Sequence, residues 1–462
     1  MSTDHVTIRT GAYADSVALL QVSRDVQGVA GVATAQVAMA TALNVAVLTE
    51  LGFEVPAGTT PNDLVVAIRL DDDGDLDQAL AAVDRGLAPV RSDGSAREAE
   101  PRRTTGSALA EAPGLVLVSV PGASALVEAM DALDAGCDVM VFSDNVPIAQ
   151  EVALKRTAAE RGLLVMGPDC GTAVVGGVGL GFANATEPGP VGIVAASGTG
   201  CQQVLALLDH AGVGVGSALG VGGRDLSADV GGTSTIEALR RLDADDSVEL
   251  VLVVSKPPAP EVAARIEQYA VTLSTPVELA LLGPGQPDLT AAVERVLARL
   301  GVEIPTWPVV GHVDPGSGGP VRGLFVGGTT CQEAQIVVEG LDPRDHTFVD
   351  FGDDAYTQGR AHPMIDPTLR LEEVRRAAAD PGTGALLLDV VLGHGAEPDP
   401  AALLAPAIAD ADVPVVIAVV GTRLDPQDHD RQVRVLAEAG AEVHLSNAAA
   451  ARRAVELAGG AR

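Results

Sequence analysis

One local design occurs twice in this chain, and it strongly limits the folds that the chain can adopt. Residues 191–204, VGIVAASGTGCQQV, pass from an apolar run through a glycine-rich turn into a helix, and residues 322–337, RGLFVGGTTCQEAQIV, repeat that order. Apolar runs and amphipathic stretches alternate after each copy, which predicts parallel sheets with flavodoxin-like strand order. We therefore expect two related α/β domains in a pseudo-twofold arrangement, with Cys201 and Cys331 at equivalent helix starts.

The remaining segments extend this α/β organisation. Strand-like and helix-like stretches alternate as βαβαβ after the linker, which predicts a Rossmann-like parallel-sheet domain, and the N-terminal segment predicts a small α/β unit. Between them lies a polar segment with too few apolar residues to bury a core. The predicted boundaries are 1–90 for the small N-terminal domain, 91–113 for the linker, 114–190 for the Rossmann-like domain, and 191–310 and 322–458 for the two flavodoxin-like domains.

Composition and charge exclude several classes of function. The chain has 462 residues, a formal net charge of −32 and 2% aromatic residues. Such a surface repels nucleic acid and offers few rings on which bases stack, so we expect no nucleic-acid partner. The first residues contain neither a basic start nor an apolar signal core, and no apolar run approaches the ~20 residues of a membrane span. We therefore expect a cytoplasmic protein without membrane association.

The cysteines predict buried thiols. They lie far apart without C-x-x-C spacing, which disfavours a zinc site and a disulfide framework. We assign no metal-binding site to them. The four cysteines are Cys137, Cys170, Cys201 and Cys331.

The glycine-rich turns predict a site for a negatively charged group. A turn of this kind at the start of a helix lets backbone N–H groups approach a ligand, and the helix dipole favours an anion there. Either turn alone is equally consistent with ordinary strand-to-helix geometry, whereas the duplication favours binding. Arg224 offers a bidentate contact to an anion, or pairs with Asp225, Asp229 or another carboxylate. The candidate phosphate- or substrate-binding residues are Ser197, Gly198, Thr199, Gly200, Gly223, Arg224, Gly328, Thr329 and Thr330.

Two residues are candidates for catalysis. Lys256, one of only two lysines, follows an apolar run and precedes two prolines. Its ammonium either neutralises a phosphate or carboxylate or is a solvated group at a strand end. His394, between two glycines, is a candidate phosphoacceptor or general acid–base, with a loop histidine without chemistry as the alternative. Asp350, Asp353 and Asp354 are candidate ligands of Mg²⁺ with a phosphorylated substrate, or helix-capping residues.

The order of these motifs resembles one enzyme family. SDNVP, MGPDCGT, SGTGCQQV and GGRDL, within about residues 114–300, resemble the α subunit of succinyl-CoA synthetase. VGGTTCQEA, DFGDDA and DVVLGHG, within residues 322–458, are similar to the C-terminal domain of its β subunit. Together they resemble the FdrA-type acyl-CoA synthetase-like proteins across nearly the whole chain. The resemblance implies succinyl-CoA synthetase-type domains for the two repeats, and a hetero-oligomer with other subunits. It also implies a CoA-like site at Pro121, Gly122, Asn145, Pro168 and Asp169.

The chain differs from succinyl-CoA synthetase in the loops through which that enzyme transfers phosphate. Residues 279–293, which correspond to its histidine loop, contain no histidine, and Ser255 to Pro258 replace its glutamate loop. No ATP-grasp nucleotide site precedes the second repeat, and the N-terminal region lacks the glycine-rich turn on which that enzyme binds CoA phosphates. We expect no nucleotide-driven thioester synthesis by this chain alone, and weak or no CoA binding by the isolated chain.

Three functions fit these observations. The first is an acyl-CoA synthetase-like enzyme that holds an acyl or carbamoyl phosphate between the two helix starts and works with partner chains. The second, implied by the FdrA-type resemblance, is a subunit of an oxamate carbamoyltransferase in allantoin or purine nitrogen catabolism. The third is a non-catalytic anion-binding subunit. The fold favours the first function, and the loss of the histidine favours the second.

Overall fold

A computed structural model describes residues 3–12, 14, 16–71, 74–88, 102, 104–110, 114–357 and 362–459 of the chain. The chain divides into two compact units. One unit comprises Met1–Pro101 and Asp354–Ala361, and the other comprises Arg102–Asp353 and His362–Arg462.

The first unit is the small α/β domain predicted from the sequence. Its antiparallel sheet has the order β1-β3-β2. The central strand is buried on both faces, because Val66 and Ile68 pack in one cluster with α1 and α3, whereas Val65 and Ala67 pack in another with Leu48 of α2. The elements are β1 (Thr3–Arg9), α1 (Ser16–Gln27), β2 (Val32–Met39), α2 (Ala42–Glu50), β3 (Leu64–Leu70) and α3 (Leu76–Gly86), and α12 (Asp354–Thr357) is grouped with them.

The predicted linker lies largely outside the described residues. Within it the structure describes a short helix, α4 (Thr105–Leu109), which Thr104 caps. Residues 91–101, 103 and 111–113 are not among those described.

The second unit begins with the βαβαβ segment predicted for the Rossmann-like domain. The three strands form a parallel sheet of order β4-β5-β6. The β7–β8 hairpin that follows joins the sheet of the first repeat through β10 instead. These elements are β4 (Val116–Val118), α5 (Gly122–Asp134), β5 (Val139–Val141), α6 (Ile148–Arg161), β6 (Val165–Met166), β7 (Thr172–Val175) and β8 (Val178–Gly181).

The first repeat forms a sheet of order β12-β11-β9-β10-β7-β8. Its own four strands are parallel, and the first strand lies between the second and the third, which is the flavodoxin-like order. The elements are β9 (Val191–Ala196), α7 (Gly198–His210), β10 (Val215–Gly220), α8 (Thr233–Asp243), β11 (Leu250–Ser255), α9 (Pro260–Ala270), β12 (Val277–Leu281) and α10 (Leu289–Leu300).

The second repeat has the same strand order, with the sheet β13-β18-β17-β16-β14-β15. Cys201 and Cys331 are each the fourth residue of the helix after the first strand, which confirms their predicted equivalence. The elements are β13 (Val309–Val310), β14 (Val321–Phe325), α11 (Gly328–Leu341), β15 (Thr347–Asp350), α13 (Thr368–Ala378), β16 (Ala385–Val391), α14 (Pro400–Ala409), β17 (Val415–Val420), α15 (His429–Glu438), β18 (Glu442–His444) and α16 (Asn447–Leu457).

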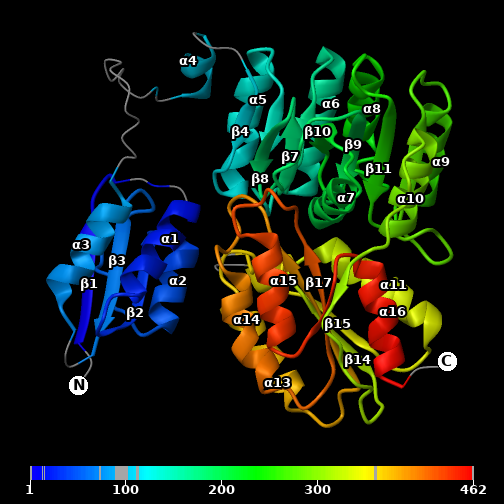
Figure 1. Ribbon diagram of the computed structural model, residues 1–462. Helices are drawn as coiled ribbons and strands as arrows, with labels where there is room; N and C mark the ends of the chain where they lie inside the picture. The colour runs from blue at the N-terminus through cyan, green and yellow to red at the C-terminus, as the bar shows by residue number, and fades with distance from the viewer. Residues whose placement is uncertain are drawn as a thin grey trace. The chain divides into compact units, whose positions relative to one another are not determined.

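Helices flank the sheets of both repeats, as Figure 1 shows. Strands β9, β11, β16 and β17 are therefore buried along their whole length, and this explains their continuous apolar sequences. All four cysteines are buried thiols, as predicted.

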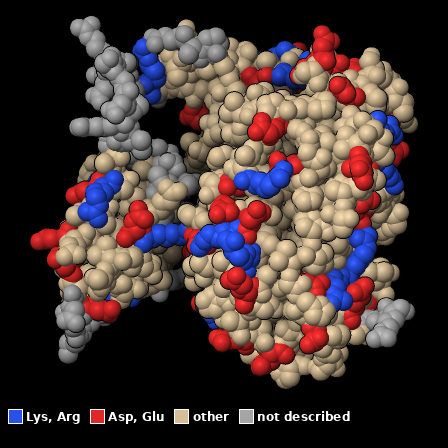
Figure 2. Space-filling model, viewed as in Figure 1, with Lys and Arg blue, Asp and Glu red and all other residues tan. Residues whose placement is uncertain are grey.

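Both signs of charge occur at the surface. On the face in Figure 2, basic side chains lie scattered among acidic ones. Among the helices that the structure describes, none is both long enough and apolar enough to cross a bilayer.

Candidate functional site

The predicted binding residues of the two repeats lie at the carboxyl ends of their parallel strands. In the first repeat, β9 and β11 are neighbours, and Ala196 is paired with Ser255. Ser197 and Lys256 therefore leave two adjacent strands at the same edge. In a flavodoxin-like sheet this is the point at which the strand order reverses, and ligands bind there.

The starts of α7 and α11 contact each other. Ser197 Oγ donates a 2.7 Å hydrogen bond to Thr329 Oγ1, and the Thr329 N–H donates to Thr199 Oγ1 at 3.3 Å. Packing is close, because a Cβ placed on Gly327 would lie 2.7 Å from Thr199 Cγ2, and one placed on Gly200 would lie 2.9 Å from Thr329 Cγ2. The two glycine-rich turns thus form one region. We name it the anion site after the ligand that the sequence predicts there, and it comprises the starts of α7 and α11 together with Lys256.

The α7 side of the anion site contains a polar group without a partner. Thr172 is 2% exposed, and its Oγ1 has no hydrogen-bond partner in the part of the chain that the structure describes. It lies 3.9 Å from the position of a Cβ on Gly198, the first residue of α7. Buried hydroxyl groups are normally hydrogen-bonded, so this unpaired hydroxyl is an exception in the described structure. Ser197 caps the same helix by accepting the Gly200 N–H at 2.9 Å.

The α11 side already contains a carboxylate of the chain itself. Asp389 is fully buried and accepts hydrogen bonds from the N–H groups of Val326 and Gly327 and from Thr330 Oγ1. Arg370 donates to the same carboxylate at 3.2 Å. The predicted binding residue Thr330 is therefore engaged with Asp389. Since a negative group compensates the start of α11, the two helix starts differ chemically.

Lys256 lies at the anion site next to Asp350. A Cβ placed on Gly328 would lie 2.5 Å from Asp350 Oδ2 and 2.8 Å from Lys256 Nζ, so both groups approach the first residue of α11. Burial raises the pKa of Asp350 to about 6, although the Lys256 ammonium acts in the opposite direction.

His362 joins this group, and the sequence did not identify it. A Cβ placed on Gly352 would lie 2.6 Å from His362 Nε2 and 3.2 Å from Asp350 Oδ1, so both side chains approach this glycine. Its Nδ1 accepts the Met364 N–H at 3.2 Å, and its ring lies 5.9 Å from the Phe182 ring. Burial lowers the pKa of His362 to about 4, so the ring is neutral near pH 7. Its sequence context, AHPMID, contains no motif that signals a site.

His394 has different neighbours. It is exposed, and its backbone N–H donates to Ala183 O at 3.0 Å. Its ring lies 3.8 Å from the position of a Cβ on Gly179. The contacts of His394 are therefore with β8 and the residues that follow it, whereas Lys256 approaches the start of α11.

Arg224 pairs with a carboxylate, which was the alternative left open by its sequence. The partner is Glu151 of α6, at 2.9 Å, and a second N–H of Arg224 donates to Val146 O. Glu151 also pairs with the buried Lys155, whose Nζ lies 2.8 Å from Asp225 Oδ1. This network fixes the loop after β10, which includes the exposed Gly223, against α6.

The residues of the CoA-like site follow the three strands of the Rossmann-like sheet. A Cβ on Gly122 would lie 2.2 Å from Asp144 O, so only glycine permits this contact between the loops. Asn145 and Asp169 have left-handed backbones, with φ of 52° and 55°. Non-glycine residues adopt this conformation rarely and often at functional sites. The five predicted residues, Pro121, Gly122, Asn145, Pro168 and Asp169, thus line the carboxyl edge of the sheet β4-β5-β6.

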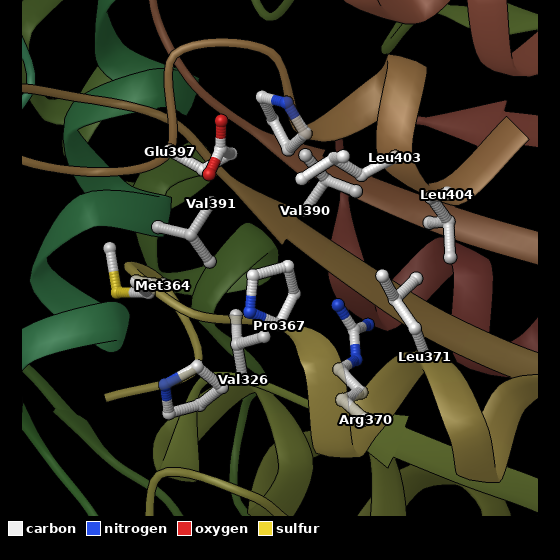
Figure 3. Close-up of a pocket in the computed structure, with 12 residues that line it drawn as sticks. Val326, Met364, Pro367, Arg370, Leu371, Val390, Val391, Glu397, Leu403 and Leu404 are labelled. Atoms are coloured by element: carbon white, nitrogen blue, oxygen red, sulfur yellow. The ribbon is translucent and has the colours of Figure 1, made fainter. Parts of the chain in front are cut away.

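One cavity lies within the second repeat, and another lies between the two repeats. Figure 3 shows the first, where the Arg370 side chain lies between Pro367 and Leu371. Its volume of about 30 Å³ is enough for one or two water molecules only. The second, of about 200 Å³, is lined by the loop after β12, by Glu333 of α11 and by Arg452 of α16.

The acidic residues proposed for Mg²⁺ are only partly described. Asp350 accepts the Gly352 N–H at 2.9 Å. The Asp354 side chain lies outside the described residues. Across the described ranges, no group of three or more His, Cys, Asp or Glu side chains is arranged to hold a metal ion.

Comparison with known proteins gives two family models and a full-length relative. Residues 1–103 match the model described as AllF, heavy metal-associated domain, and residues 324–457 match the model described as CoA-ligase. YahF of Escherichia coli K12, an uncharacterized protein, is 35% identical over 489 residues, which cover 94% of this chain and 95% of YahF. Subunit alpha 2 of the ADP-forming succinate–CoA ligase of Archaeoglobus fulgidus is 30% identical, over 33% of this chain and 52% of the subunit.

Two solved structures are similar to parts of this chain. Acetyl-coenzyme A synthetase 1 of Ca. Korarchaeum cryptofilum, in complex with phosphate and ADP, is 15% identical and covers 75% of this chain and 84% of its own, with a TM-score of 0.30. ATP citrate lyase of Methanothrix soehngenii, in complex with citrate and coenzyme A, is 17% identical and covers 43% of this chain and 37% of its own, with a TM-score of 0.34.

The residues of the N-terminal domain do not fit a heavy-metal site. Soft metal ions select thiolate and thioether ligands. All four cysteines lie outside residues 1–103, and the thioether and imidazole donors within that range are Met1, Met39 and His5. The match to a heavy metal-associated domain therefore describes the fold of this segment, and we derive no metal chemistry from it.

Proposed function

The chain belongs to the acyl-CoA synthetase-like family that includes YahF of Escherichia coli, and we propose that it binds an acyl or carbamoyl phosphate at the anion site. The observation that carries this proposal is the contact between Ser197 and Thr329, because it brings two helix starts and Lys256 to one place. Helix N-termini and an ammonium group favour a phosphate, and the unpartnered Thr172 hydroxyl adds a donor.

The proposed reaction is transfer of the acyl group to CoA. The CoA thiol attacks the carbonyl carbon, the carbon–oxygen bond to phosphate breaks, and inorganic phosphate leaves. Lys256 and the α7 N-terminus stabilise the charge that accumulates on the departing phosphate. The loops that contain Gly122, Asn145 and Asp169 are the proposed contacts for CoA.

Partner subunits complete the proposed enzyme. The histidine loop of succinyl-CoA synthetase is replaced here, so we propose that other chains form the acyl phosphate from a nucleotide, with Mg²⁺ as the accompanying ion. One relative is subunit alpha 2 of a succinate–CoA ligase, which supports a hetero-oligomer.

Carbamoyl transfer is the alternative within the same site. A carbamoyl phosphate differs from an acyl phosphate only in the group on the carbonyl carbon, so the phosphate contacts are shared. The match of residues 1–103 to an AllF domain does not distinguish the two donors. A non-catalytic anion-binding subunit would bind either compound and form no product.

Calorimetric titration with acetyl phosphate and with carbamoyl phosphate tests the proposal. We expect Lys256→Ala to weaken binding about 10- to 150-fold, which corresponds to the loss of a charge-assisted contact of about 1.5–3 kcal/mol. Lys256→Arg keeps the charge and should keep most of the affinity. Arg265→Ala removes an exposed charge on α9 and serves as the control. Equal affinities for wild type and Lys256→Ala would disprove a phosphate contact by Lys256.

A further inference from the structure

We propose that Asp350 is a catalytic residue: it accepts the proton of the nucleophile as that nucleophile attacks the acyl phosphate at the anion site. The inference rests on the proposed function, because it requires an acyl phosphate beside Lys256. It adds a proton acceptor that neither the sequence motifs nor the relatives assign.

Asp350 is held between two glycines at the edge of the second sheet. It is the last residue of β15 and is paired with Phe325, the last residue of β14. Its Oδ1 accepts the Gly352 N–H at 2.9 Å, and its Oδ2 lies 2.5 Å from the position of a Cβ on Gly328. Only glycines at these positions leave room for the carboxylate, so Oδ2 is directed to the first turn of α11.

The Oδ2 atom has free lone pairs. No residue that the structure describes donates a hydrogen bond to it, whereas Oδ1 is fixed by Gly352. Lys256 Nζ lies on the same side, 2.8 Å from the Cβ position on Gly328. A phosphate bound by Lys256 would therefore place its acyl carbon near Oδ2. A nucleophile that approaches this carbon meets the free side of the carboxylate.

The other titratable groups around Asp350 are poor proton acceptors. Lys256 is an ammonium with donors only. His362 is neutral, with its Nδ1 engaged by the Met364 N–H, and its lowered pKa of about 4 makes it a weak base. The Cys331 thiol has a raised pKa because it is buried, so it is also neutral.

The remaining neighbours adjust the basicity of Asp350. Burial is the largest cause of its raised pKa, and the negative charges of Asp389 and Asp353 act in the same direction. The Lys256 ammonium and the hydrogen bond from the Gly352 N–H lower the pKa of Asp350. The resulting pKa of about 6 is close to neutral pH, where a carboxylate is mostly ionised yet basic enough to take a proton in a transition state.

In the proposed step, the CoA thiol displaces phosphate from the carbonyl carbon. The sulfur of the CoA thiol forms a bond to the carbonyl carbon with its lone pair, and its proton moves to Asp350 Oδ2. The electrons of the carbon–oxygen bond leave with the phosphate group. The products are the thioester, inorganic phosphate and protonated Asp350, which returns the proton to solvent.

The test compares Asp350→Asn with wild type, using the full chain with the subunits that copurify with it. Acetyl phosphate binding is measured by calorimetry, and formation of acetyl-CoA from acetyl phosphate and CoA is measured across about pH 5 to 8. We expect Asp350→Asn to lower the rate about 100-fold or more and to leave acetyl phosphate affinity equal or tighter. Asp350→Glu should restore part of the rate, and Asp345→Asn, an exposed carboxylate before β15, is the control.

Each outcome is decisive. A wild-type rate that falls below about pH 6, with this acidic limb lost in Asp350→Asn, supports the assignment. An undiminished rate in Asp350→Asn, or a wild type that binds acetyl phosphate without forming acetyl-CoA, overturns it and leaves the anion site intact. Absence of binding of both acetyl phosphate and carbamoyl phosphate to wild type disproves the proposed function itself.

Discussion

The hydroxyl of Ser197 donates a 2.7 Å hydrogen bond to the hydroxyl oxygen of Thr329, 132 residues further along the chain. Ser197 is the N-cap of α7, and Thr329 lies in the first turn of α11. Both side chains are buried. Together with the bond from the Thr329 N–H to Thr199 Oγ1, this bond joins the two repeats at the residues that begin their helices.

Mutation of this pair should reveal an energetic coupling between the repeats. We expect Ser197→Ala and Thr329→Val each to lower the free energy of unfolding by about 1–2 kcal/mol, because each leaves a buried polar partner unpaired. The double variant should lose less than the sum of the two losses, by about 0.5–1.5 kcal/mol. Urea unfolding of the four proteins measures the coupling. Strictly additive losses would show that the bond contributes nothing to stability.

A methyl group on Gly328 should obstruct the anion site without unfolding the protein. The added Cβ would contact the ends of the Asp350 and Lys256 side chains, which can move. We expect Gly328→Ala to reduce acetyl phosphate affinity about 10-fold or more, since the lysine contact of about 1.5–3 kcal/mol is displaced. Calorimetry measures this change.

Gly340→Ala is the matched control on the same helix. A Cβ at Gly340 has no neighbour within 4 Å in the described structure, so the substitution should leave binding unchanged. It should also stabilise the protein by roughly 0.5–1 kcal/mol, because alanine favours the helix. Similar losses of affinity in both variants would indicate a general effect on α11 and would contradict a specific role for Gly328.

The repeated architecture could be predicted because its evidence is local. Strands such as β11 and β17 are short apolar runs between helical stretches, and the glycine turns recur in the same order, so strand order and the equivalence of Cys201 and Cys331 followed from pattern alone. The match between the two helix starts also suggested one shared site. Side-chain partners across that site depend on tertiary packing, which the pattern of apolar residues in the sequence does not reveal.

Asp389 and His362 illustrate that limit. Asp389 lies inside an apolar strand, LLLDVV, and its role in accepting the N–H groups that precede α11 depends on the contact between β14 and β16. His362 and Asp350 both approach Gly352, where a Cβ would leave no space for the His362 ring. Arg224 had a partner of the predicted kind, a carboxylate, but the partner is on α6. Such pairings can be assigned only after the fold is known.

The buried lysine is expected to be essential for stability. Lys155 pairs with Glu151 at 2.7 Å and with Asp225 at 2.8 Å, and all three are almost completely buried. Lys155→Met removes the ammonium from two buried carboxylates, of which Glu151 keeps its pair with Arg224 and Asp225 keeps the hydrogen bond from Thr235, so we expect a loss of about 3–5 kcal/mol in the free energy of unfolding. Arg240→Met, which breaks an exposed pair with Glu237, should cost at most about 1 kcal/mol. Equal losses in the two variants would refute this interpretation of the network.

The pH dependence of stability should identify Glu333. Its Oε1 accepts the Leu289 N–H at 2.6 Å, its Oε2 accepts from Asn447 at 2.7 Å, and the side chain is buried beside the 200 Å³ cavity. Burial raises the pKa of Glu333 from its ordinary 4.5 to about 7. Between these values the folded protein keeps a proton that the unfolded chain releases. This contribution to stability is therefore present at low pH and is lost as pH rises toward 7.

Glu333→Gln should remove that dependence, because the amide does not ionise. The variant should gain stability relative to wild type as pH rises from about 4.5 to about 8, by on the order of 3 kcal/mol. Urea unfolding of both proteins at several pH values measures the difference between their free energies of unfolding. Effects that the two proteins share, such as the acid titration of His362, cancel in this difference. Glu339→Gln changes an exposed carboxylate on the same helix and should show no such trend. If the difference between Glu333→Gln and wild type stays constant with pH, then Glu333 is already ionised in the folded protein, and its buried charge is compensated by Leu289 and Asn447.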